Sequence, residues 1–330
     1  MKKKYVILSL IIALCISLCK LPYVASAECE CVYLGGMPAG FRIDNRGATI
    51  IGLNDVISSD GLYSPAKDAG IRAGDLMLTL DGKEINSAAD IGVVLSDYDG
   101  NGITATIERE GEIIIKIVYP AKDISGKYRM GMFVRDDVSG IGTITYIKEN
   151  NEFGALGHPV TEGESQKAVR INSGVAYGCN IIGVNRGVRG KAGEIRGYFI
   201  EDEILGVIEK NTAAGIFGKI TDEKFTDGLK KMETGEAKPG KASLYSTVEG
   251  TRPKEYEITI VKADRSAAEN KDLVVKITDE KLIEKTGGIL QGMSGSPIVQ
   301  NGKLVGAVTH VFLNDPTRGF GISIEKMIKE

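Results

Sequence analysis

A serine in a glycine-rich stretch near the C-terminus has the surroundings of a nucleophile. The stretch GGILQGMSGSPIVQNG (287–302) places Ser294 between Met293 and Gly295, two residues after Gly292. A serine hydroxyl is a weak nucleophile at neutral pH, so it needs an adjacent base and N–H donors for the developing oxyanion. Glycines allow positive φ and a close substrate carbonyl. The stretch predicts Ser294 as nucleophile and the N–H groups of Gly292 and Ser294 as oxyanion hole; an ordinary glycine-rich hairpin is the alternative.

The base for such a serine has only two candidates, because the chain contains two histidines, His158 in FGALGHPV and His310 in GAVTHVF. His158 lies far enough before Ser294 to belong to a different barrel, and the order histidine then serine is found in known triads. His310 falls on the strand that returns after the serine, where it is expected to pack or to line a cleft. We therefore predict His158 as the general base.

An acidic partner for the histidine cannot be chosen from spacing alone. The aspartates that remain open are Asp202, Asp222, Asp264, Asp272 and Asp279.

The elements around these residues are predicted to be mainly β. From residue 121 to residue 330 many short apolar runs alternate with glycines, which is typical of a sandwich or barrel. The serine is followed by a strand, a turn at Asn301-Gly302 and another strand, a pattern that resembles the second barrel of chymotrypsin-like proteases. Residues 121–330 are thus predicted to form a chymotrypsin-like double β-barrel, the serine peptidase domain.

Residues 28–120 are predicted to form a smaller domain with an N-terminal lead-in. Ala88–Leu95 has helical spacing behind Ser87 as N-cap. The segment Ser64–Ile85, SPAKDAGIRAGDLMLTLDGKEI, resembles the PDZ domains attached to bacterial envelope proteases. In that family a peptide adds as a strand, and a glycine-containing loop binds its C-terminal carboxylate. The resemblance implies a peptide ligand and places the loop at Gly40, Phe41, Arg42 and Ile43. The alternative is that Gly40 merely turns the chain.

The first 27 residues are predicted to be a signal peptide or a transient membrane anchor. Three lysines precede the apolar stretch Tyr5–Cys19, and Ala25-Ser26-Ala27 fits a cleavage site. The apolar stretch is short for a permanent membrane-spanning helix. We therefore expect an exported protein that is initially associated with the membrane.

The amino-acid composition gives no indication of a nucleic-acid, metal or cofactor ligand. The net charge is −3, with acids and bases interspersed, so no nucleic-acid partner is expected. Cys29, Cys31 and Cys179 are too few for a disulfide scaffold, and two close thiols without a histidine make a weak metal site. Neither a metal nor an organic cofactor is expected.

Taken together, the export segment, the PDZ-like segment, GALGHPV and EKTGGILQGMSGSPIVQNGKLVGAVTHVFLNDPTRGFGI resemble the stage IV sporulation protein B family of endospore-forming Firmicutes. The resemblance implies His158 as base, Ser294 as nucleophile and Asp279 as the acid, with Thr309 and Asn211 in supporting roles. An aspartate so shortly before the serine departs from the chymotrypsin order, in which the acid lies in the first barrel.

The same resemblance implies a sporulation signalling serine endopeptidase. Such an enzyme cleaves itself near its N-terminus and cuts a membrane-bound regulator between the two forespore membranes, which leads to activation of a late sporulation sigma factor. A non-catalytic PDZ-containing envelope adaptor with a degenerate protease fold is the alternative. An esterase-type hydrolase is disfavoured, because the serine lacks the strand–elbow–helix context of that class.

Met293, the residue directly before Ser294, indicates how such an enzyme would be activated. In trypsin-like enzymes an acidic residue at this position pairs with a newly cut N-terminus. A thioether cannot form that ion pair, so activation is not expected to follow the trypsinogen route.

Overall fold

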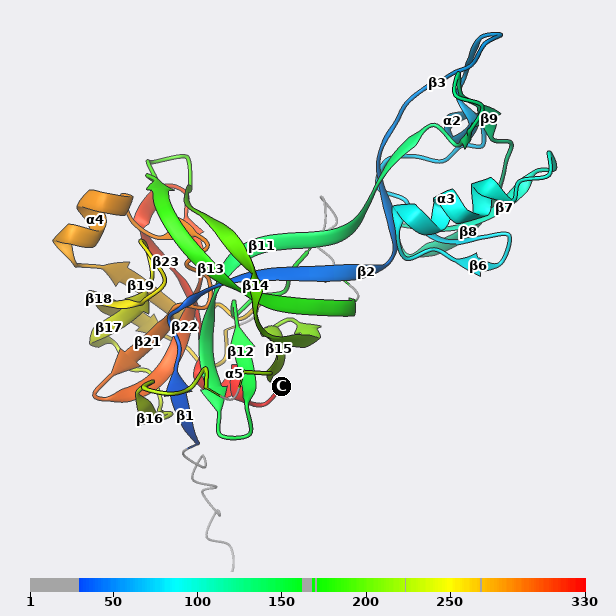
Figure 1. The fold of residues 1–330 in the computed structure, drawn as a ribbon. Coiled ribbons are helices and arrows are strands. Elements are labelled where there is room, and N and C mark those ends of the chain that lie inside the picture. The colour runs from blue at the N-terminus through cyan, green and yellow to red at the C-terminus, as the bar shows by residue number, and fades with distance from the viewer. Residues whose placement is uncertain (1–29, 162–167, 170, 223, 268) are drawn as a thin grey trace, which may run out of the picture. The chain divides into compact units, whose positions relative to one another are not determined.

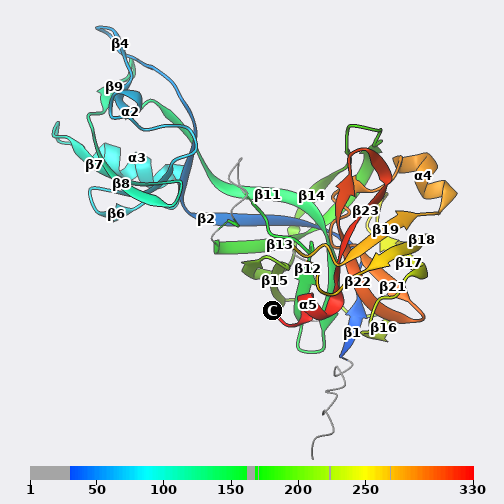
Figure 2. The same cartoon turned by 180° about the vertical axis from the view of Figure 1, so that it is seen from behind.

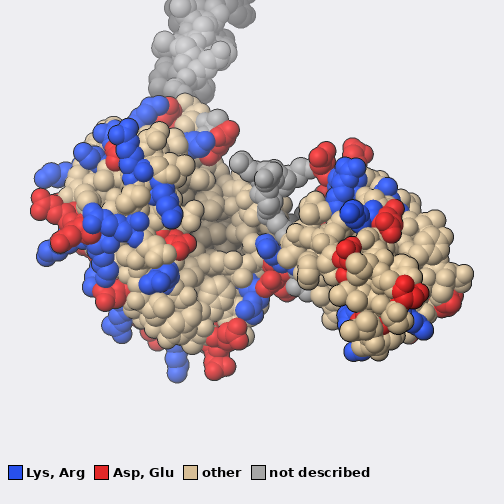
Figure 3. Space-filling model, turned by 90° about the horizontal axis from the view of Figure 1, so that it is seen from above, with Lys and Arg blue, Asp and Glu red and all other residues tan. Residues whose placement is uncertain are grey.

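The computed structural model describes residues 30–161, 168–169, 171–222, 224–267 and 269–330. The predicted export segment, residues 1–27, lies outside them. No helix within the described ranges is both long and apolar enough to cross a membrane. On the face shown in Figure 3, lysine and arginine are interspersed with aspartate and glutamate.

Six strands close into a first β-barrel (Figure 1). Closure follows from the pairing of β2 with two neighbours, β11 on one edge and β13 on the other. Buried side chains such as Phe41, Ile144, Phe153 and Ile216 fill its interior. In ladder order the strands are β2 (Pro38–Leu53), β11 (Met132–Lys148), β12 (Glu152–Ala155), β15 (Gly215–Ile220), β14 (Gly193–Thr212) and β13 (Ile171–Asn185). The short strands β1 (Cys31–Leu34) and β16 (Lys231–Glu233) extend it from β11.

A second group of six strands forms a closed barrel from the C-terminal part of the chain (Figure 2). Leu244, Ile258, Val275, Ile298 and Val308 are among its buried core residues. Its strands are β17 (Gly240–Ser246), β18 (Lys254–Ala263), β19 (Leu273–Ile277), β23 (Asp315–Ser323), β22 (Lys303–Phe312) and β21 (Pro297–Gln300). Helix α4 (Glu280–Thr286) and β20 (Leu290–Gln291) connect β19 to β21, and α5 (Ile324–Ile328) ends the chain. The prediction of a mainly β chain with a double barrel is confirmed.

The smaller predicted domain has a hydrophobic core of its own, which includes Ile50, Met77, Leu80, Ile103 and Ile107. The predicted helix is present as α3 (Ala88–Ser96), and Ser87 forms a capping box with Asp90. The remaining elements are β3 (Val56–Ile57), β4 (Leu62–Tyr63), α2 (Pro65–Asp68), β5 (Leu76–Leu80), β6 (Lys83–Glu84), β7 (Ile103–Arg109), β8 (Glu112–Val118), β9 (Ala121–Lys122) and β10 (Tyr128–Arg129).

The boundaries of this smaller domain differ from the predicted 28–120. Strand β1 and the first part of β2 belong to the first barrel, because β1 and Pro38–Asp44 pair with the barrel part of β11. The ladder between β2 and β11 is interrupted after Asp44 and resumes at Thr49. The smaller domain is therefore inserted between two strands of one barrel. A linear division could not reveal this, because strands remote in sequence share the ladder.

Candidate active site

Ser294 lies on a turn between β20 and β21, and the first barrel holds that turn. Thr143 of β11 donates its N–H to Ser294 O at 3.0 Å and its hydroxyl to Gly292 O at 3.1 Å. Thr145 of the same strand donates its hydroxyl to Gly295 O at 2.7 Å. The nucleophile turn of the second barrel is thus tied to one strand of the first.

Gly295 is required by the tightness of this contact. Its φ is +91°, and a Cβ at this position would lie 2.2 Å from Thr143 O and 2.5 Å from Leu156 N. Gly292 also has a positive φ, +96°. Both glycines therefore have the positive φ that the sequence predicted for them. At Gly295 close packing is a second reason for glycine.

Met293 is fully buried beneath the turn. Its sulfur accepts the N–H of Leu290 at 3.3 Å. The residue before the nucleophile therefore anchors the turn by packing and one weak hydrogen bond, without a partner that an N-terminus would have to supply.

The Ser294 hydroxyl donates to the backbone oxygen of Thr309 at 2.8 Å. Thr309 is 3% exposed, and its own hydroxyl is one of two buried side-chain polar atoms without a hydrogen bond in the described part of the chain. The predicted supporting residue Thr309 therefore does lie beside the nucleophile. In this structure it holds the Ser294 hydroxyl through its main chain.

His158 follows β12 and a tight turn in which Leu156 and Gly157 have φ of +67° and +72°. Its Nδ1 is 2.9 Å from the carbonyl oxygen of Pro159. Burial lowers the pKa of the half-buried His158 ring, and the Pro159 carbonyl partly offsets this by favouring the charged form. The ring is therefore neutral at neutral pH, as a general base must be.

His310 lies next to His158, with ring centroids 5.0 Å apart and planes at 41°. Although its side chain is exposed by surface area, the surrounding protein atoms, together with His158 and Lys271, lower its pKa to about 4. Both histidines and Ser294 line one pocket of about 1020 Å³, to which Gly292 and Thr309 also contribute. The two barrels thus bring together the predicted base, nucleophile and oxyanion-hole residue, and the predicted cleft-lining histidine is there too.

Asp279 is placed elsewhere than predicted. It is the N-cap of α4, where its Oδ1 accepts the N–H of Leu282 at 2.8 Å, and it does not line the pocket of His158 and Ser294. A carboxylate at an N-cap satisfies a helix N–H that has no partner within the helix. Local sequence therefore explains this aspartate without any contact to the histidine.

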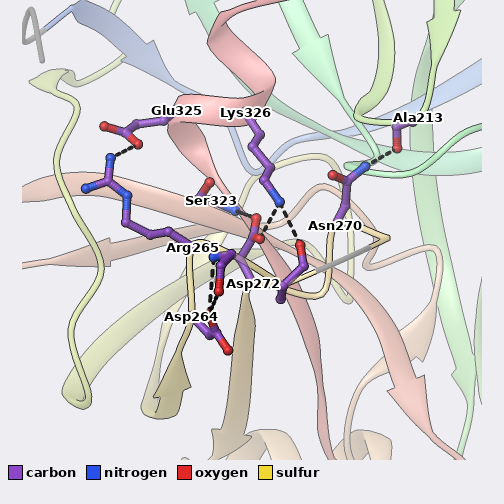
Figure 4. A network of polar contacts seen from close by, with 10 residues as sticks. Ala213, Asp264, Arg265, Asn270, Asp272, Ser323, Glu325 and Lys326 are labelled. Atoms are coloured by element: carbon purple, nitrogen blue, oxygen red, sulfur yellow. Dashed lines mark hydrogen bonds and ion pairs between the residues drawn. The ribbon is translucent and has the colours of Figure 1, made fainter.

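The other candidate aspartates do not line the pocket either. Asp272 is buried, where it accepts from Lys326 Nζ at 2.6 Å and from Ser323 N at 2.9 Å and so anchors the last helix (Figure 4). Asp264 accepts from the hydroxyl of Ser266 at 2.7 Å in the same loop. Asp222 accepts from a backbone N–H at 3.0 Å, and Asp202 is an exposed residue of β14.

Among the residues that the structure describes, the carboxylate that lines the pocket is Glu269, which the sequence did not indicate. It forms an ion pair with Lys271 at 2.6 Å. Glu269 and Asn270 both have φ of +55°, and Asn270 donates to Ala213 O at 2.5 Å (Figure 4). No pattern in the sequence marks this loop as part of the pocket wall.

Asn211 contacts the segment that carries His158. Its Oδ1 accepts the N–H of Val160 at 2.9 Å, and its Nδ2 donates to Val160 O at 2.8 Å and to Val169 O at 3.0 Å. The predicted supporting residue therefore acts on the chain beside the histidine rather than on the ring.

The predicted peptide-binding loop is wrong. Gly40, Phe41, Arg42 and Ile43 lie in β2 inside the first barrel, paired with β11 on one edge and with β13 on the other. Phe41 and Ile43 are buried in the barrel core. A strand paired on both edges has no free backbone N–H groups to bind a carboxylate.

Comparisons with known proteins identify a family and several similar proteins. A family model described as SpoIVB peptidase S55 matches residues 126–328. A curated protein of Clostridium perfringens described as "Putative zinc metalloprotease" is 35% identical over 69 residues, 21% of each chain. One of Brucella suis with the same description is 28% identical over 98 residues, which cover 28% of this chain and 25% of the other. The chain thus spans about a quarter or less of these relatives' length. The crystal structure of the inactive form of the Rv3671c protease matches 57% of this chain and 81% of its own, with 12% identity and a TM-score of 0.35.

Proposed function

The chain belongs to the SpoIVB peptidase S55 family, a family of serine peptidases, and from this premise we propose that Ser294 and His158 carry out its catalysis. The observation that supports these roles is the shared pocket, in which a serine on a glycine turn and a neutral histidine meet from two different barrels. The function is hydrolysis of peptide bonds in protein substrates.

The proposed mechanism begins with rotation of the Ser294 hydroxyl away from Thr309 O toward Nε2 of His158. His158 takes the hydroxyl proton while Ser294 Oγ attacks the substrate carbonyl, and the N–H groups of Gly292 and Ser294 bind the oxyanion. The imidazolium then protonates the leaving amine, and an ester links the substrate to Ser294. Water, deprotonated by His158, hydrolyses that ester and restores the enzyme.

The biological role we propose is signalling during sporulation. The SpoIVB family match supports the link to sporulation. In the proposed role the enzyme is exported and held at first by its N-terminal segment. It cleaves itself and a membrane-bound regulator between the forespore membranes, which leads to activation of a late sigma factor. The alternative function is a non-catalytic adaptor that keeps the fold without the chemistry.

A fluorophosphonate probe that reacts with activated serines tests the proposal directly. Wild-type protein is expected to be labelled and to release new N-termini from itself or a protein substrate, whereas Ser294→Ala should lose both. His158→Gln should lower labelling by several orders of magnitude, since the triad template loses about 10⁴-fold or more without its base. Ser266→Ala, which alters an exposed serine outside the pocket, is the matched control. Equal labelling of wild type and Ser294→Ala would favour the adaptor.

For the smaller domain we propose that it is a PDZ domain and that it binds the C-terminus of a peptide. The supporting observation is a pocket of about 1070 Å³ between α3 and the start of β11. Ile91 and Leu95 of α3 line it on one side, and Met132–Val134 of β11 line it on the other. This part of β11 pairs with β2 along one of its edges. Arg129 lies at the pocket too, two residues before Gly131, which has φ of +74°.

This groove replaces the predicted loop as the candidate peptide site. An extended peptide would add to the other edge of β11, and its carboxylate would lie near Gly131 and Arg129. Binding of fluorescent peptides that end in valine or leucine should be weakened by C-terminal amidation and by Arg129→Glu. Equal binding of free-acid and amidated peptides would contradict the site.

A further inference from the structure

The carbonyl group that His158 contacts defines the protonation of its ring. Pro159 O lies 2.9 Å from Nδ1 of His158. A carbonyl oxygen can only accept, so Nδ1 must carry the proton and Nε2 keeps its lone pair in the neutral ring. This is the tautomer in which Nε2 can accept a proton from Ser294.

The same peptide unit is held from its other side by Asn211. The C=O of Pro159 and the N–H of Val160 belong to one planar peptide, so fixing the direction of one group fixes the other. Val160 N–H donates to Asn211 Oδ1 at 2.9 Å. The orientation of the Asn211 amide is unambiguous, because its Nδ2 faces the two carbonyl oxygens of Val160 and Val169.

An acceptor for the ring proton is thus supplied by the main chain. Among the described aspartates and glutamates, Glu269 lines the pocket but is paired with Lys271, and Asp279 caps α4. A hydrogen bond donated from Nδ1–H orients the imidazole and supports its charged form. This is the task that an aspartate performs in a serine–histidine–aspartate triad.

We propose that Asn211 is a positioning residue that sets the tautomer and orientation of His158 through the Pro159–Val160 peptide, with the Pro159 carbonyl in the place of a triad carboxylate. The proposal rests on the proposed function in one respect, the role of His158 as general base. The geometry of the ring and its peptide stands independently of that role.

The test uses the small number of histidines. Full-length protein labelled with ¹⁵N in histidine has two imidazoles, and a His310→Gln variant assigns their nitrogen signals. In wild type, neutral His158 should be protonated at Nδ1. In Asn211→Ala, the Nε2-protonated tautomer should appear and the pKa of His158 should fall further, because the carbonyl contact raises that pKa. Asn180→Ala, which removes an exposed amide bonded to the Tyr198 hydroxyl, is the control and should change neither.

Kinetics supply a second readout. Asn211→Ala should lower kcat by about 10- to 100-fold, as removal of partners that orient functional histidines does at metal sites, while KM changes little. Asn211→Asp keeps an acceptor for Val160 N–H and should retain more of the Nδ1-protonated tautomer than Asn211→Ala. If Asn211→Ala does not fold, Asn211→Asp can be compared with wild type in its place.

The outcomes separate this proposal from the proposed function. An Nε2-protonated His158 in wild type, or an unchanged tautomer, pKa and kcat in folded Asn211→Ala, would overturn the positioning role. The nitrogen spectra do not require activity and can be recorded in a Ser294→Ala background. If cleavage proves independent of Ser294 while the tautomer depends on Asn211, the proposed function fails and the positioning of the ring stands.

Discussion

The nucleophile and the base each have a backbone carbonyl as hydrogen-bond partner. Ser294 donates to Thr309 O, and His158 donates from Nδ1 to Pro159 O. Neither contact occupies Nε2 of His158, the atom that must take the serine proton. In the proposed mechanism the Ser294 hydroxyl therefore has to turn from Thr309 O toward Nε2 of His158.

The pH dependence of activity should follow His158. Its pKa is lowered mainly by burial, so the ring stays neutral below its ordinary pKa of about 6.5. The protonated ring cannot act as base, so kcat/KM for Ser294-dependent cleavage should remain high through that pH and fall only as the pH drops through the lowered pKa. A profile of kcat/KM from acid to neutral pH checks this. A half-maximal pH above the ordinary value would contradict it.

Thr309 and Asn211 show that a family resemblance can indicate which residues support a site without indicating what those residues contact. The family resemblance pointed to Thr309 and Asn211, and both lie at the pocket or beside the segment that carries the base. Their contacts involve main-chain atoms of residues far away in sequence. Side-chain type and spacing carry no information on such contacts.

At the scale of elements, the turns and caps were predictable because neighbours in sequence determine them. Asn301-Gly302 forms the expected turn, with φ of +52° and +77°, and Ser87 caps the expected helix. The loop at Gly40 was not predictable, since the pairing partners of β2 decide whether a glycine lies in a loop or in a strand. Asp279 illustrates the same point, because its helix-capping role is local whereas its distance from His158 is not.

The nucleophile turn should tolerate no side chain at Gly295. Gly302 has a similar φ, but a Cβ there would have nothing within 4 Å, so Gly302→Ala isolates the cost of backbone conformation, about 1–2 kcal/mol. Gly295→Ala adds a clash with Thr143 O and should cost more in chemical denaturation. It should also slow fluorophosphonate labelling, whereas Gly302→Ala should not. Equal effects of the two variants would show that packing against β11 is unimportant.

At the scale of the whole molecule, the site exists only where the two barrels meet. The base comes from the first barrel and the nucleophile from the second, and hydroxyl groups of Thr143 and Thr145 connect the nucleophile turn to β11. The Asp272–Lys326 ion pair separately fixes the C-terminal helix to the second barrel (Figure 4).

Thr145→Val tests the connection between the barrels. Valine has nearly the same shape but leaves the carbonyl of Gly295 without its 2.7 Å hydrogen bond, which should lower the free energy of unfolding by about 1–3 kcal/mol. Labelling of Ser294 should slow as well, because the turn loses a support. Thr104→Val, at an exposed strand position, is the control for the same chemical change. Unchanged stability and labelling in Thr145→Val would show that this hydroxyl does not couple the barrels.

The sequence by itself determined the local features: the glycine turn at Ser294, the strand pattern of a double barrel, the capped helix and the two histidines that could act as base. These depend on residues that are neighbours along the chain, and their physical preferences are strong. Only the tertiary structure decided which residues meet. It inserted the smaller domain between β2 and β11, put Gly40–Ile43 inside a barrel, and left Asp279 on a helix while Asn211 and Pro159 came to His158. Those outcomes depend on strand pairing across long stretches of chain, which no short pattern of residues encodes.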